Sequence, residues 1–176
     1  TYGKYKKTKI KAGLVSKDSG LFSYNSFLTA INLAKNKKVS AICTLPINKE
    51  SWKKAGINYV GHTDMLRDIF KQDAIMMLGC NEMFVSLYTE HIPLKDVPKQ
   101  IKTKKLSKFL IDFYNCIDSN DKPIGVLGLN PHAGDNGVLG NEEIKIEKAI
   151  KKVNKQIGSK YQLLVPDIAF TPHVRQ

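Results

Sequence analysis

Hydrophobic side chains follow two kinds of pattern, which alternate along the chain. Apolar residues spaced three and four positions apart predict helices over residues 23–35, 49–55, 64–70, 103–117 and 142–155. Short, nearly continuous apolar runs predict strands over residues 39–45, 74–78, 83–89, 123–129 and 161–165. Strands that alternate with helices are typical of an α/β fold with a largely parallel or mixed sheet.

Composition narrows the class of protein. The chain has 176 residues, of which 42% are hydrophobic and 25% are charged, as in ordinary globular proteins. It contains no apolar run near the roughly 18 residues that a membrane-spanning helix needs, so we expect no membrane association. Cys43, Cys80 and Cys116 lack metal-site spacing, and we expect three reduced, mostly buried thiols in a cytoplasmic protein. The chain starts without a helix cap or strand and stops soon after a strand, as expected of a fragment.

Net charge is strongly positive but carried by one residue type. The formal charge is +12, and all but two of the 28 basic residues are lysine. Nucleic-acid binding proteins usually depend on arginine for bidentate contacts to bases and phosphates, so nucleic acid is not the expected partner. The lysines fall on the polar faces of the helices predicted over 103–117 and 142–155, where they favour a solvated surface. The same field would attract a small anionic substrate.

Three histidines share a position relative to the predicted elements. His91 and His132 follow predicted strands, and His62 precedes a predicted helix. Loops at the carboxyl ends of strands converge on the ligand crevice of open α/β sheets, so these imidazoles could bind a divalent metal. Their spacing matches no short metal motif. Hydrogen-bonded surface or capping roles therefore stay open for each of them.

Two turns have features of binding loops. Gly134, Gly137 and Gly140 punctuate residues 130–140, although neither the phosphate-binding loop pattern nor the dinucleotide-binding pattern is present. Residues 61–64 (GHTD) open a helix whose N–H groups, together with hydroxyl and imidazole donors, suit a carboxylate or phosphate. An ordinary N-cap by Thr63 explains the second turn equally well.

Taken together, the motifs occur in a single order. They are PINK (46–49), GHTDML (61–66), MML (76–78), TEHIPL (89–94), GLNPHAGD (128–135) and LGNEE (139–143). This series resembles the 4-hydroxythreonine-4-phosphate dehydrogenase family of pyridoxal phosphate (vitamin B6) biosynthesis. The resemblance covers residues 19–171.

The resemblance implies an activity and an architecture. The family oxidises 4-phosphooxy-L-threonine with NAD or NADP, and the resulting β-keto acid loses CO2 to give 3-amino-2-oxopropyl phosphate. It uses zinc, magnesium or cobalt, and it forms a homodimer with the active site at the interface. The implied fold is a three-layer α/β/α arrangement like that of isocitrate and isopropylmalate dehydrogenases, incomplete in this chain. Residues 1–57 would be the tail of the first α/β domain, and residues 58–176 most of the second, which binds metal and forms the dimer.

Site residues follow from the same resemblance. His91 and His132 match two of three metal-binding histidines, and His62 and Thr63 match a substrate-binding pair. The resemblance therefore makes His62 a ligand of the substrate and not of the metal. It identifies no general base. The third metal histidine lies in a Tyr-His-Asp stretch that is missing before Gln176, and the surroundings of His173 do not match it. We therefore expect this chain alone to be inactive. A paralogue that acts on 4-phosphothreonate and a non-catalytic dimerisation fragment remain the alternatives.

Overall fold

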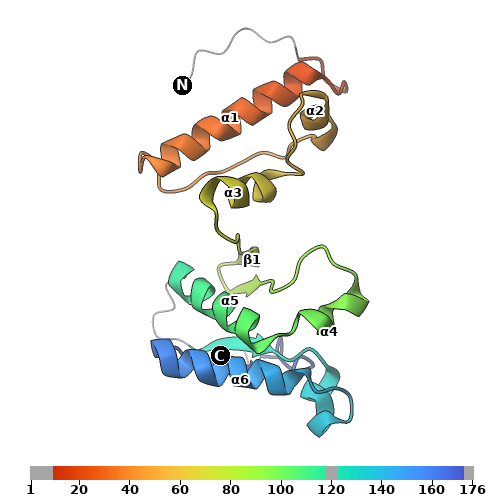
Figure 1. Ribbon diagram of the computed structural model, residues 1–176, viewed down its shortest axis with the longest axis vertical. Coiled ribbons are helices and arrows are strands. Elements are labelled where there is room, and N and C mark those ends of the chain that lie inside the picture. Colours follow the sequence, from red (N-terminus) through yellow and green to blue (C-terminus); the bar gives the residue numbers. More distant parts are fainter. Residues whose placement is uncertain (1–9, 118–122, 173–176) are drawn as a thin grey trace. The chain divides into compact units, whose positions relative to one another are not determined.

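The computed structural model describes residues 10–117 and 123–172 (Figure 1). The chain divides into two compact units, Thr1–Ala74 and Ile75–Gln176. These units are defined by packing, and their boundary differs from the division at residues 57 and 58. The division into family domains stays a prediction. His173 lies outside the described residues.

Three helices make up the described part of the first unit: α1 (Lys17–Lys35), α2 (Lys49–Lys54) and α3 (His62–Phe70). All three were predicted, but α1 begins six residues earlier than its apolar spacing indicated. It begins there because Ser16 and Ser19 form a reciprocal capping box, in which the Ser16 hydroxyl accepts from the Ser19 N–H at 3.1 Å. The core of the unit comprises Phe27, Ile31, Trp52 and Met65.

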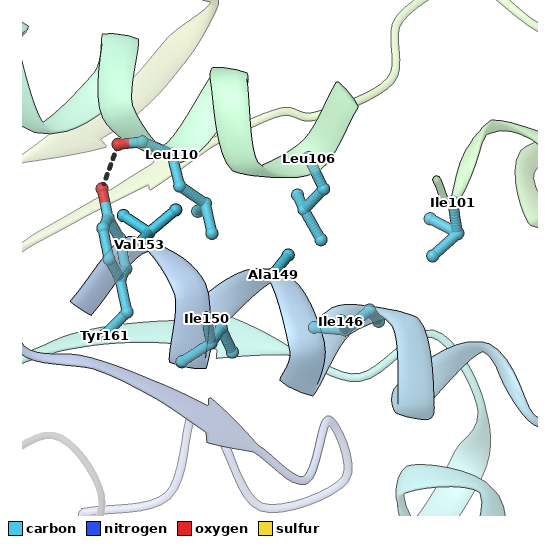
Figure 2. Close-up of a cluster of buried hydrophobic side chains, with 8 residues drawn as sticks. All are labelled: Ile101, Leu106, Leu110, Ile146, Ala149, Ile150, Val153 and Tyr161. Carbon is cyan, nitrogen blue, oxygen red and sulfur yellow. Dashed lines mark hydrogen bonds between the residues drawn. The ribbon is translucent and has the colours of Figure 1, made fainter. Parts of the chain in front are cut away.

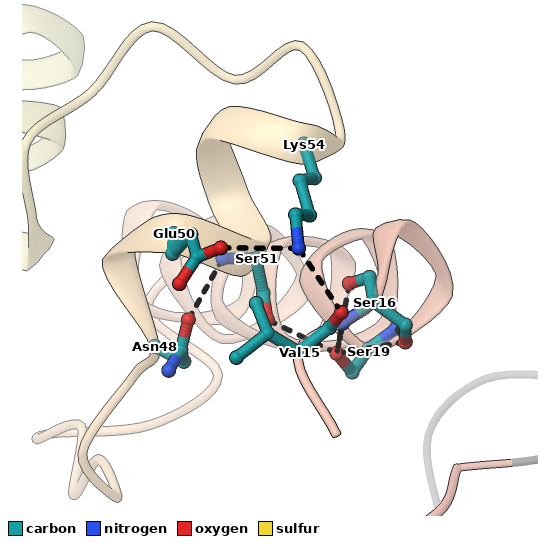
Figure 3. Close-up of polar contacts among 7 residues, drawn as sticks. All are labelled: Val15, Ser16, Ser19, Asn48, Glu50, Ser51 and Lys54. Atoms are coloured by element: carbon teal, nitrogen blue, oxygen red, sulfur yellow. Dashed lines mark hydrogen bonds and ion pairs between the residues drawn. The ribbon is translucent and has the colours of Figure 1, made fainter.

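Short polar contacts fix α2 against the start of α1 (Figure 3). Asn48 caps α2 by accepting the Ser51 N–H at 2.8 Å, and the Ser51 hydroxyl lies 3.2 Å from that of Ser19. The helices approach closely at Gly20, where a Cβ atom would lie 2.1 Å from the Ser51 carbonyl oxygen. Only glycine fits at that point of α1.

The strand predicted over residues 39–45 is wrong. This segment has no regular structure, and Val39 and Leu45 are 40% and 84% exposed. Ile42 packs against the core of the first unit, which accounts for part of the apolar run. An extended segment becomes a strand only when a neighbour pairs with its backbone, and residues 10–74 contain no strand that could do so.

The second unit combines helices with two small sheets. Its elements are β1 (Met77–Cys80), β2 (Met83–Ser86), the 3-10 helix η1 (Leu94–Asp96), α4 (Val97–Gln100), α5 (Thr103–Cys116), β3 (Ile124–Leu127), the turn η2 (Pro131–Gly137), α6 (Glu142–Ile157) and β4 (Tyr161–Leu164). Strands β1 and β2 form an antiparallel hairpin, whereas β3 and β4 pair in parallel. The protein is thus a mixed α/β structure, as predicted.

Helices α5 and α6 pack face to face and, with β4, enclose the core of the second unit (Figure 2). The residues of this core are Ile101, Leu106, Leu110, Ile146, Ala149, Ile150, Val153 and Tyr161. The Tyr161 hydroxyl donates to the Leu110 carbonyl at 2.8 Å, which gives its buried oxygen a partner. Gly158 ends α6 in the left-handed conformation.

Surface features confirm one expectation and correct another. The lysines of α5 and α6 are exposed, so they form a solvated face. The three cysteines are unpaired as expected but are exposed, so the expectation of mostly buried thiols is wrong. Cys80 ends β1, a strand whose residues are all exposed, and an apolar run therefore did not imply burial there. Within the described residues, no helix has the length and apolar character needed to span a bilayer.

Candidate functional site

His62 is the first residue of α3, and aromatic rings hold its imidazole. The ring lies edge-on to Phe27, with centroids 4.5 Å apart, and to Trp52, at 6.0 Å. Burial against these rings lowers the pKa of His62 below its usual value, because the charged form loses hydration. At neutral pH the side chain is therefore a neutral imidazole that can donate one hydrogen bond and accept another.

Thr63 is not the N-cap of α3, contrary to one interpretation of the sequence. Gly61 occupies the N-cap position and Thr63 lies inside the first turn. Gly61 has no side chain with which to cap the helix, so the hydroxyl of Thr63 is not used in that role. The Asp64 carboxylate accepts the Val60 N–H at 3.1 Å and so links the first turn of α3 to the residue before Gly61. First-turn N–H groups lack partners within the helix, which suits an anionic ligand beside His62 and Thr63.

In the second unit, parallel pairing brings two loops to the same edge. Strands β3 and β4 are neighbours, so the segments that follow their carboxyl ends emerge side by side. His132 follows β3 and Asp167 follows β4. The Asp167 carboxylate accepts the His132 N–H at 2.8 Å, and its other oxygen lies 3.5 Å from His132 Nδ1. The bond from this N–H lowers the pKa of Asp167, so the carboxylate stays charged beside the imidazole.

The backbone around His132 is unusual. Residues 132–136 all have positive φ, at 51°, 52°, 84°, 43° and 53°. Glycine occupies just one of these positions, Gly134. Left-handed backbone costs L-residues about 1–2 kcal/mol each, somewhat less for Asp and Asn, and runs of it are rare. Strain of this kind is retained where surrounding contacts fix it, which is common at functional sites.

His91 also has left-handed backbone, with φ of 51°, and its side chain is exposed in the segment between β2 and η1. Both histidines matched to the metal site of the family therefore occupy strained positions in loops. Within the described residues, however, no three His, Cys, Asp or Glu side chains gather in a way that could hold a metal ion. The assignment of His91 and His132 as metal ligands thus remains a prediction.

The donor chemistry at His132 is compatible with a divalent cation. Its imidazole is 68% exposed, and the Asp167 carboxylate lies on the Nδ1 side. A carboxylate beside one nitrogen of a histidine, with the other nitrogen accessible, is the common arrangement for metal-binding imidazoles. These residues would supply part of a coordination shell.

Sequence reasoning missed Asp167, although a signal was present. Asp167 comes two residues after the strand predicted over 161–165, as His132 comes shortly after the strand predicted over 123–129. Both therefore occupy the carboxyl-end position that was used to select histidines. Asp167 was overlooked because that selection considered imidazoles alone.

A large cavity in the second unit has the wrong chemistry for a phosphorylated ligand. Its volume is about 490 Å³, and its lining includes Phe84, Phe109, Phe113 and Phe170. Glu82 is the one charged side chain among the described residues that line it. A phosphate would therefore find no cation in this space. The helix N–H groups and polar side chains at the start of α3 suit such a ligand better.

Comparison with known proteins identifies the family of the chain. Residues 2–176 match the family of the pyridoxal phosphate biosynthetic protein PdxA. A 4-hydroxythreonine-4-phosphate dehydrogenase of Sulfurimonas denitrificans is 59% identical over 169 residues, which is 95% of this chain and 54% of the relative. One from Helicobacter pylori is 47% identical over 167 residues. The chain therefore belongs to the PdxA family, as its motifs indicated.

Solved structures agree with the sequence comparison. The crystal structure of a 4-hydroxythreonine-4-phosphate dehydrogenase from Klebsiella pneumoniae matches with a TM-score of 0.84 at 28% identity. The match covers 94% of this chain and 52% of that protein. This chain thus spans about half the length of the relatives that it matches.

Proposed function

We propose that this chain is part of an NAD- or NADP-dependent dehydrogenase that oxidises the hydroxyl of 4-phosphooxy-L-threonine. Decarboxylation of the resulting β-keto acid would give 3-amino-2-oxopropyl phosphate, a precursor in pyridoxine 5′-phosphate synthesis. Membership of the PdxA family supports the reaction. The observation that carries the site is the pairing of His132 with Asp167 at the carboxyl edge of β3 and β4.

His62 and Thr63 are proposed to bind substrate. The imidazole is neutral at physiological pH because burial lowers its pKa, so it acts as a hydrogen-bond partner rather than as a counter-ion. Phe27 and Trp52 restrict its rotation, which limits the entropy lost when a ligand binds. Thr63 adds a hydroxyl one residue further along the first turn of α3.

His91 and His132 are the proposed protein ligands of a divalent zinc, magnesium or cobalt ion. When bound, such an ion would act as a Lewis acid toward the substrate hydroxyl and toward the enolate left by loss of CO2. In this proposal Asp167 orients His132, because its carboxylate accepts the backbone N–H and lies beside Nδ1. The remaining contacts would come from parts of the protein outside residues 1–176.

The proposed assembly is the homodimer implied by the family resemblance, with a three-layer α/β/α fold like that of isocitrate and isopropylmalate dehydrogenases. The parallel pairing of β3 with β4 and the packing of α6 against β4 support such a layered arrangement in the second unit. Parallel sheets are ordinarily covered on both faces.

The test is a spectrophotometric assay of the intact protein. With 4-phosphooxy-L-threonine, either NAD or NADP, and Zn2+, Mg2+ or Co2+, we expect the absorbance of the reduced nicotinamide to rise. The H132A variant should reduce this rate by at least about 100-fold, whereas K151A should leave it unchanged. Oxidation of 4-phosphothreonate but not of 4-phosphooxy-L-threonine would replace the substrate assignment. The absence of oxidation with both compounds would contradict the proposal.

A further inference from the structure

Glu143 is the one charged side chain that is buried among the residues that the structure describes, with 7% of its surface exposed. It lies in the first turn of α6, next to Glu142, which is only partly buried. Burying a carboxylate is unfavourable unless hydrogen bonds compensate for the lost hydration. The partners of Glu143 therefore indicate what this side chain does.

Its carboxylate accepts three hydrogen bonds from the segment that connects β3 to His132. One carboxylate oxygen accepts the Leu129 and Asn130 N–H groups, both at 2.8 Å. The other accepts the side-chain amide of Asn130 at 2.9 Å. Burial acts to raise the pKa of Glu143, but these bonds outweigh it and hold the pKa below its usual value. The side chain is therefore a charged acceptor.

The following turn is folded against the same carboxylate. At Gly134, the middle residue of the left-handed run, a Cβ atom would lie 2.8 Å from the Glu143 carboxylate and 2.7 Å from the Gly140 carbonyl oxygen. The Leu139 N–H in turn donates to the Gly134 carbonyl at 3.0 Å. Glu143 thus contacts the strained turn both at its entrance and at its centre.

We propose that Glu143 is a positioning residue for His132. By fixing the two residues before Pro131 and packing on Gly134, it stabilises the left-handed backbone that carries the imidazole. The inference rests on the proposed function in that His132 is there a ligand at the reacting centre. It adds a buried residue that acts on that ligand through the backbone of the turn, in addition to the exposed Asp167.

The first test compares two substitutions on one helix. In E143Q the side chain keeps its shape, but one of its two acceptor oxygens becomes an amide donor that faces either the backbone N–H groups or the side-chain amide of Asn130. E147Q removes the same charge from an exposed residue of α6 whose carboxylate is paired with Lys151 at 3.0 Å. We expect E143Q to lower kcat/KM and Co2+ affinity at least about 10-fold, since small displacements of reacting groups have large effects. E147Q should stay within about twofold of the wild type.

A second pair disturbs the turn without altering the carboxylate. Gly134 and Gly158 both have left-handed backbone, with φ of 84° and 68°. A Cβ atom at Gly134 would meet the contacts above, whereas one at Gly158 would meet nothing within 4 Å. The general penalty for alanine in this conformation is therefore common to G134A and G158A. We expect G134A to reproduce the defects of E143Q, and G158A to change thermal stability alone.

Amide hydrogen exchange separates this inference from the proposed function. In the intact protein, E143Q should accelerate exchange of the peptide that contains residues 129–132 at least about 10-fold, with exchange in α6 unchanged. If the wild type shows neither activity nor Co2+ binding, the proposed function is overturned. The exchange result then decides by itself whether Glu143 holds the turn. Unchanged exchange, or a fall in melting temperature with normal kcat/KM and Co2+ affinity, would overturn the inference. If E143Q does not fold, G134A decides in the same way.

Discussion

His62 and His132 belong to different units and are held by opposite means. His62 packs edge-on against the rings of Phe27 and Trp52, and apolar packing sets both its orientation and its lowered pKa. His132 is exposed on a left-handed turn, where the Asp167 carboxylate binds its backbone. The first arrangement should respond to core volume, and the second to charge and backbone geometry. Substitutions can therefore disturb the two histidines separately.

The largest effect is expected from W52A. Trp52 is fully buried, and its indole N–H donates to the Ser23 hydroxyl at 2.8 Å. Removing the indole leaves a cavity in the core of the first unit and should lower the free energy of unfolding by about 3–5 kcal/mol. Urea denaturation followed by circular dichroism measures this loss. W52F, which keeps a ring near His62, should lose less. A loss below about 1 kcal/mol in W52A would show that the aromatic cluster does not support the unit.

The two units also differ in how well the sequence predicted them. Helices α5 and α6 were predicted to within two residues because both are amphipathic, and the apolar face of each packs against the other. The strand predicted over 39–45 was wrong because a strand needs a neighbour that pairs with its backbone, and an apolar run does not report such a neighbour. Residues 62–64 were correctly placed at a turn into a helix, although the capping residue is Gly61 and not Thr63.

Local sequence patterns could not predict the contacts between elements. The bond between Asp167 and His132 depends on the pairing of β3 with β4, which no single segment encodes. Regularly spaced glycines marked the loop over 130–140 as special, but four of the five left-handed residues are not glycine. For Glu143 a signal was present, since it lies three residues before Ile146, on the apolar face of α6. An acidic residue on such a face points to a buried carboxylate with partners.

The second-largest effect is expected from D167N, which should act on His132 alone. Asparagine is similar in shape but accepts the His132 N–H without a full charge and no longer offers a carboxylate to Nδ1. Residues of this kind beside metal-binding histidines commonly account for about 10–100-fold in affinity. We therefore expect weaker Co2+ binding by calorimetry, with unfolding of the first unit unchanged. Wild-type affinity in D167N would mean that Asp167 does not orient His132.

Acidification should lower the free energy of unfolding through protonation of His62. Its folded pKa is lower than the value of about 6.5 in the unfolded chain, so folding favours the neutral form. This contribution is fully present above pH 6.5 and is lost as the pH falls through the folded pKa. The free energy of unfolding should thus decline more between pH 7 and pH 5 in the wild type than in H62F. Equal declines would contradict the role of burial.

The smallest effect is expected for the exposed pair of Lys151 and Glu147 on α6, whose charged atoms lie 3.0 Å apart. Exposed pairs of this kind contribute roughly 0.5 kcal/mol or less. K151A should therefore change neither the histidine-dependent properties nor the melting temperature appreciably. A large loss in K151A would show that the lysine-rich face has a structural role beyond solvation.

The central claim is that carboxylates hold the backbone of the exposed loop that carries His132. Amide exchange of the wild-type protein, followed residue by residue by NMR without substrate, tests it most directly. The N–H groups of Leu129 and Asn130, bonded to Glu143, and of His132, bonded to Asp167, should exchange at least about 10-fold more slowly than expected for open chain. Exchange of all three at the open-chain rate would contradict the account.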